Sequence, residues 1–108
     1  MSQHVYPSAY KGQPVNIVVG FDRPLRGFFL NVELTEAEGF VYTSCSDPQL
    51  IYSRGFTDSM TPFCEKLDEL GLSLPLAIIE QVELDAATNA GNRYVVYDQD
   101  GKIQTPRA

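Results

Sequence analysis

Two runs of alternating side chains, joined by a short turn, constrain the fold of this chain more than any other feature. In residues 15–19 (VNIVV) every odd position holds Val or Ile, and in residues 27–34 (GFFLNVEL) the even positions hold Phe, Leu, Val and Leu. Successive side chains of a β-strand point to opposite faces, so this alternation is typical of a strand with one buried face. Pro24 and Gly27 lie between the runs and favour a reversal of the chain. The two runs therefore predict an antiparallel hairpin.

Two further runs favour β-structure. Residues 40–45 (FVYTSC) follow the hairpin after a charged break, and residues 93–97 (RYVVY) lie near the end of the sequence. Both are rich in the β-branched and aromatic residues that strands favour. Asp100-Gly101 is a turn dipeptide, which predicts one more short ladder after the last strand.

The sequence between these runs predicts two helices. Thr61-Pro62 is typical of a helix start and Gly71 of a helix stop, and a second apolar stripe with helical spacing follows Pro75. The element order is then β-β-β-α-α-β. Because strands come first and helices later, we expect an α+β fold, with an antiparallel sheet of four to five strands and two helices packed on one face.

The first residues of the chain show no such periodicity. Residues 1–13 contain Pro7 and Gly12, so the sequence predicts a flexible N-terminal arm there and a single α+β domain over residues 14–108. A chain of 108 residues is close to the most common size of a domain with one core.

Acidic residues are concentrated in the helical region. The net charge is −6, and six carboxylates between residues 62 and 90 accompany the single base Lys66. Such a run is most often a solvated face, but it can also attract a basic protein or imitate phosphates in a nucleic-acid-binding groove. The eight basic residues are scattered, so we expect no direct nucleic-acid binding. The six carboxylates are Glu65, Asp68, Glu69, Glu80, Glu83 and Asp85.

The patterns of common catalytic and metal sites do not occur in the sequence. His4 is the one histidine, and it lies in the expected arm, where a catalytic base would not be held rigidly. Cys45 and Cys64 have no zinc spacing, and no phosphate-binding glycine loop is present. We expect two reduced thiols, no catalytic residue, no metal site and no cofactor.

The turn of the first hairpin, residues 22–26 (DRPLR), allows two interpretations. Asp22 can cap a solvent-exposed turn and pair weakly with Arg23 or Arg26. Alternatively, the two guanidinium groups can bind a carboxylate or a phosphate. In that case a small-molecule or enzyme site is expected between residues 22–26 and 46–60, with Tyr97 at the same cleft.

Apolar residues also occur on the strand faces that point away from the expected helices. Val18, Phe29 and Val96 occupy such positions, which indicates that the second face of the sheet is covered as well. A homo-oligomer that packs through this face is one explanation.

Three segments of the chain resemble a known group of proteins. GFDRPLRGFFL, FVYTSCSDPQL and GNRYVVYDQDG are similar to segments in a loose group of uncharacterised small single-domain proteins of Gram-negative bacteria, often carried on plasmids and integrated elements. The similarity spans residues 14–98. It implies a bacterial cytoplasmic protein with an accessory role and carries no catalytic residues. Independently, the sequence has no apolar run long enough for a membrane span and no secretory signal pattern, so we expect a cytoplasmic protein.

These observations favour a small acidic, non-enzymatic interaction or regulatory module. We expect it to bind another protein with a basic surface, through the acidic helical face or the arginine-bearing hairpin tip. The alternatives are a binding protein or enzyme for an anionic small molecule at the 22–26 and 46–60 loops, and a nucleic-acid mimic from a mobile element.

Overall fold

A single sheet of five strands forms the centre of the molecule, and the computed structural model describes residues 1–104. The strand order is β4-β3-β2-β1-β5, and all neighbours are antiparallel except β1 and β5, which are parallel. The predicted α+β class is therefore confirmed, although the sheet is mixed rather than wholly antiparallel. The strands are β1 (Ser2–Tyr10), β2 (Gln13–Asp22), β3 (Gly27–Leu34), β4 (Phe40–Thr43) and β5 (Arg93–Val96).

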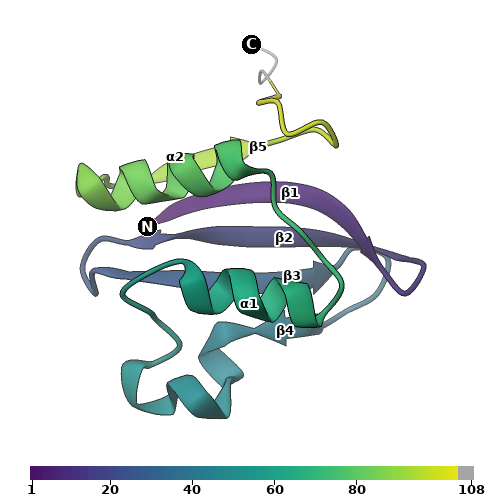
Figure 1. The fold of residues 1–108 in the computed structure, drawn as a ribbon, viewed down its shortest axis with the longest axis horizontal. Helices are drawn as coiled ribbons and strands as arrows, with labels where there is room; N and C mark the ends of the chain where they lie inside the picture. Colours follow the sequence, from purple (N-terminus) through teal and green to yellow (C-terminus); the bar gives the residue numbers. More distant parts are fainter. Residues whose placement is uncertain (105–108) are drawn as a thin grey trace.

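Both helices lie on one face of the sheet, as predicted. Figure 1 shows α1 (Thr61–Glu69) in front of β3 and α2 (Leu76–Ala87) along the β1–β5 side, where α2 packs on β1 and β2. Phe63 and Leu67 of α1 and Ile78 and Val82 of α2 are buried against the inward side chains of the strands. Within residues 1–104, neither helix has the length and apolarity needed to cross a membrane.

The expectation of a flexible arm over residues 1–13 is wrong. These residues form β1 and a two-residue turn, in which Lys11 (φ 49°) and Gly12 (φ 81°) both adopt the left-handed conformation of a tight hairpin. The inward positions of β1 include Ser2, His4 and Tyr6, which are polar or amphipathic. The strand therefore lacks the apolar alternation that reveals β2 and β3.

The segment between β4 and α1 is folded rather than extended. It contains two short 3-10 helices, η1 (Ser44–Ser46) and η2 (Pro48–Ser53). It then returns to the sheet, where Phe28 and Thr57 exchange two backbone hydrogen bonds of 2.9 and 3.0 Å. At Gly55 a Cβ atom would lie 2.5 Å from the Cα of Cys45, so only glycine permits this close return.

The chain beyond β5 forms the short ladder that Asp100-Gly101 predicts. Asp98 N–H donates to the carbonyl of Lys102 across this turn, and Gln104 N–H donates to the carbonyl of Val96, at 2.8 Å each. Tyr97 and Ile103 form a bridge between the two segments.

The second face of the sheet carries a smaller apolar cluster. Val5, Val18 and Phe29 are buried there, with Phe56 and Val96 packed against them. The ring of Phe56 meets that of Phe29 edge to face, with centroids 6.3 Å apart. The protein's own 54–57 segment therefore covers part of the face on which apolar residues were expected.

Candidate functional site

The hairpin tip, residues 22–26, is organised as a turn. The backbone N–H of Leu25 donates to Oδ1 of Asp22 at 2.9 Å, so the carboxylate caps the turn. No ion pair found within residues 1–104 includes Asp22, Arg23 or Arg26. Arg23 lies against the loop before β5, because a Cβ placed on Gly91 would be 3.4 Å from Nη1 of Arg23. The capped turn is therefore formed, but its expected weak ion pairs are not.

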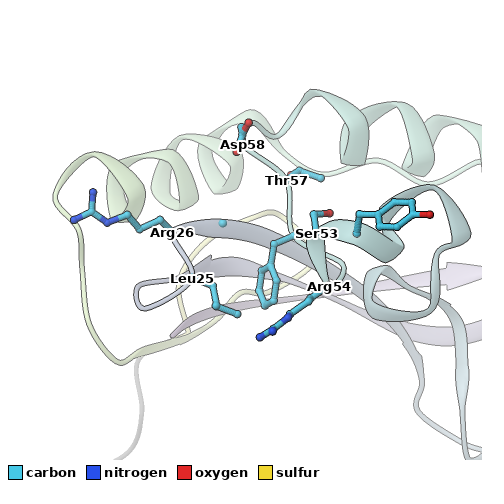
Figure 2. Close-up of a pocket in the computed structure, with 9 residues that line it drawn as sticks. Leu25, Arg26, Ser53, Arg54, Thr57 and Asp58 are labelled. Carbon is cyan, nitrogen blue, oxygen red and sulfur yellow. The ribbon is translucent and has the colours of Figure 1, made fainter.

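A pocket of about 240 Å³ lies between this tip and the 52–58 segment. Figure 2 shows Arg26 extending away from Ser53, while Arg54 extends toward the side of Leu25, so the two guanidinium groups are well separated. Both arginines have left-handed backbones, with φ of 51° at Arg26 and 58° at Arg54. A residue with a side chain seldom adopts this conformation, and it is seen more often at functional sites than elsewhere.

Tyr97 does not belong to this pocket. Its side chain is buried in the core, where its hydroxyl lies 2.7 Å from Nδ1 of His4. The expectation that Tyr97 joins Asp22, Arg23 and Arg26 around one cleft is therefore wrong. The sequence alone could not show this, because Tyr97 follows the regular alternation of β5 toward the helices.

Five of the six predicted acidic residues are exposed on the outer surfaces of the helices. The only base between residues 62 and 90, Lys66, forms an ion pair with Glu69 at 2.8 Å. We call these five residues the acidic helical face: Glu65, Asp68 and Glu69 on α1, and Glu80 and Glu83 on α2.

Asp68 of α1 and Glu83 of α2 both influence the titration of Cys64. Burial raises the pKa of the Cys64 thiol, and the negative charges of Asp68 and Glu83 raise it further. Both carboxylates therefore act on the same thiol, although they belong to different helices. The exposed carboxylates of the acidic helical face are distributed over both helices.

Asp85, the sixth acidic residue, is not on this face. It is only 1% exposed and accepts hydrogen bonds from Nε2 of His4 (2.6 Å) and from Nη1 of Arg93 (2.7 Å). Asp85 lies one turn beyond Val82 on the inward stripe of α2, so it points to the sheet. Its assignment to a partner-binding surface is wrong.

His4 is held rigidly in this buried cluster, contrary to the expectation of a mobile histidine. Burial lowers the pKa of His4, against the raising effect of its hydrogen bond to Asp85, so the imidazole is neutral at neutral pH. Nε2–H then donates to Asp85, and Nδ1 accepts from the hydroxyl of Tyr97. The strand β1 is thereby tied to α2 and to the end of β5.

The charge of Asp85 is retained in the core. Burial alone would raise the pKa of Asp85, but the hydrogen bonds from His4, Arg93 and Ser2 outweigh burial and leave the pKa lowered. Ser2 also accepts the backbone N–H of Phe21 at 3.1 Å. Because Ser2, His4, Asp85 and Tyr97 are at most 2% exposed, the cluster offers no surface to a substrate and acts as a structural connection.

The segment around Cys45 is also structural in its contacts. Asp47 accepts the hydroxyl of Tyr42 (2.6 Å) and the backbone N–H of Gln49 (2.9 Å), and so caps η2. Both cysteines are free thiols. Within residues 1–104, no group of three or more His, Cys, Asp or Glu side chains is placed to hold a metal ion.

Comparison of the chain with protein-family models, with curated proteins and with solved structures finds no match.

Proposed function

We propose that this protein is a non-enzymatic interaction module that binds a partner with a basic surface through the acidic helical face. The observation that carries the proposal is the exposure of five carboxylates on two helices that pack into the same core, where the only base of the segment, Lys66, is already paired with Glu69. Exposed charges of one sign on two helices add up to a stronger negative potential than the same charges on one helix alone.

The remaining charges support the same proposal. Glu65, Glu69 and Glu80 extend the face along both helices, and Lys66 is the only cation between them. Such a surface accelerates the encounter with a basic partner and favours it over neutral or acidic ones. The attraction acts over roughly one Debye length, about 10 Å at 0.1 M salt, so it must weaken as salt is added.

The test is capture of partners by the immobilised protein in about 50 mM and about 500 mM salt. The test variant neutralises Asp68, Glu80 and Glu83 (Asp68→Asn, Glu80→Gln, Glu83→Gln). The matched control neutralises three exposed carboxylates on loops, Glu36, Glu38 and Asp100, and so has the same net charge. The variants are written Glu36→Gln, Glu38→Gln and Asp100→Asn.

A basic protein that is bound at low salt by the wild type and by the control, but not by the test variant, supports the proposal. Equal capture by all three proteins contradicts it, because net charge would then account for the binding. Absence of any basic partner at low salt contradicts it too.

The pocket between the hairpin tip and residues 52–58 supports a second candidate function, the binding of a small anion. Its two arginines have no carboxylate partner within 4.0 Å among the described residues. Its volume of about 240 Å³ is below that of sites for drug-sized ligands, so inorganic phosphate or a short dicarboxylate is the appropriate size.

Thermal melting with inorganic phosphate and with succinate tests this second function. A ligand at a hundredfold excess over its dissociation constant stabilises a protein by about 2.7 kcal/mol, which raises the melting temperature measurably. Because the two guanidinium groups are well separated, a small anion contacts one of them, so we expect Arg54→Ala or Arg26→Ala to abolish the shift and Arg23→Ala to retain it. An unchanged melting temperature with both anions rules the function out.

A further inference from the structure

The sheet face opposite the helices contains a hollow of about 450 Å³, and this hollow does not belong to the acidic helical face. Its apolar wall is formed by Val18, Phe29 and Phe56, and its remaining lining includes both a cation, Arg54, and an anion, Glu33. Neither charge is paired within 4.0 Å in residues 1–104. The inference drawn from it does not rest on the function proposed above.

Phe40 is an exposed aromatic residue at the border of this hollow. It stands opposite Glu33 in the register of β3 and β4, and 52% of its surface is exposed. The same surface therefore carries an exposed apolar side chain, Phe40, and an apolar hollow into which such a side chain could pack. Glu33 and Arg54 likewise give it both members of an ion pair.

We propose that this face binds a second copy of the same chain in a two-fold symmetric dimer. A two-fold interface brings the same patch of both subunits together, so the patch must be complementary to itself. A patch that carries both the apolar protrusion and its hollow, and both charges, meets this requirement. Binding of a small ligand or an unrelated partner would not require that one patch hold both an apolar side chain and a hollow for it, or both a cation and an anion.

The positions along β3 fit this symmetry. Backbone hydrogen bonds between Phe28 and Thr57 hold the 54–57 segment beside the beginning of β3, whereas Glu33 lies near its end. In the proposed dimer, a two-fold axis that crosses β3 between these two positions brings Glu33 of one copy toward Arg54 of the other. Phe40, which is opposite Glu33 in the sheet register, moves with it toward the partner's hollow.

The experiment measures the molar mass of the protein over a wide concentration range by sedimentation or light scattering. We expect the wild type to reach the mass of two chains. Arg54→Glu and Glu33→Arg should each raise the dissociation constant by about tenfold or more, because each places like charges opposite one another twice in the dimer. An equimolar mixture of the two variants should form dimers again, since every Arg then faces a Glu.

Arg23→Glu and Glu36→Arg serve as matched controls, because both residues are exposed and neither lines the hollow. Phe40→Ala tests the apolar contact without a change of charge and should also give monomers. Circular dichroism must show that each variant is folded as the wild type is.

Three results would overturn the dimer. The wild type could remain monomeric at every concentration. The single charge reversals could leave the dimer intact. Folded single variants could also stay monomeric when mixed, which would show that Glu33 and Arg54 do not face each other.

Discussion

At the scale of single residues, the cluster around Asp85 determines how this protein responds to acid. A buried carboxylate is tolerated only where hydrogen bonds replace its hydration. Asp85 receives such bonds from His4, Arg93 and Ser2, which belong to two strands of the sheet. Loss of any one of these donors leaves the buried charge of Asp85 less well compensated.

Acidification should destabilise the protein before its carboxyl groups titrate. The folded pKa of His4 lies below the value of 6.5 expected for the unfolded chain, so the unfolded state binds the proton first as the pH falls. The unfolding free energy should therefore decrease below pH 6.5 by at most about 1.4 kcal/mol per pH unit. The lowered pKa of Asp85 adds a second decrease below its usual value of 3.8.

Urea unfolding of the wild type and of His4→Gln on both sides of this range provides the measurement. His4 is the single histidine of the chain, and the glutamine amide can still donate to Asp85. We expect the variant to be less stable at neutral pH, since it loses the bond from Tyr97, but to show no slope between pH 6.5 and about pH 5. A wild type without the slope, or a variant that keeps it, would contradict the assignment.

At the scale of elements, the close contact of β1 with β2 depends on Gly20. A Cβ atom at this position would lie 1.9 Å from the carbonyl oxygen of Ser2 and 2.9 Å from Cζ of Phe29. We expect Gly20→Ala to lower the unfolding free energy by more than about 2 kcal/mol, because β1 must move. The control Gly91→Ala meets only the flexible end of Arg23 at 3.4 Å and should change stability by less than about 0.5 kcal/mol. Equal effects in urea unfolding would contradict the close contact.

The influence of α1 and α2 acids on one thiol can be measured through the reactivity of Cys64. In a Cys45→Ser background, Asp68→Asn and Glu83→Gln should each lower the pKa of Cys64 and speed its reaction with a thiol reagent a few-fold. Glu80→Gln is the matched control, because Glu80 has no part in the pKa shift of Cys64. If all three variants react at the same rate, the acids do not act on this thiol.

The elements that could be predicted from the sequence are those marked by an alternation of apolar residues or by residues typical of the end of a helix. β2, β3 and the stop of α1 at Gly71, which has φ of 73°, belong to this group. β1 could not be recognised, because its inward positions hold Ser and His rather than aliphatic residues. The same fact hid the role of Asp85, whose partners lie 81 residues earlier and 8 residues later in the chain.

Of the two candidate surfaces, one could be predicted from the sequence and the other could not. The acidic residues of the helices were visible as composition, and five of the six are exposed as expected. The hollow beside Phe40 was not visible, since it forms only where the 54–57 segment returns to β3. Sequence alternation reveals which face a residue occupies, but a depression in that face depends on distant segments.

At the scale of the whole molecule, the two proposed surfaces lie on opposite sides of one sheet. The acidic helical face covers one side, and the hollow with Phe40 lies on the other. A dimer formed through the hollow would therefore leave both acidic faces in solvent. Each dimer would then present two sites for a basic partner.

A dimer should also make the thermal stability depend on concentration. Association stabilises the folded state by mass action, so the melting temperature should rise by roughly 3 °C for each tenfold increase in protein concentration. The melting temperature of Phe40→Ala should not change with concentration, since the variant melts as a monomer. Scanning calorimetry of both proteins makes the comparison, and parallel behaviour would contradict the dimer.

The parallel pairing of β1 with β5 has a consequence for biosynthesis. Ser2 pairs with Arg93, so β1 is translated long before its second neighbour, β5, is available to pair with it. Until then the nascent protein exposes one open edge of β1, to which strands of other nascent chains can add. Messages or cleavage events that end the polypeptide before residue 93 should therefore yield products that aggregate or need chaperones.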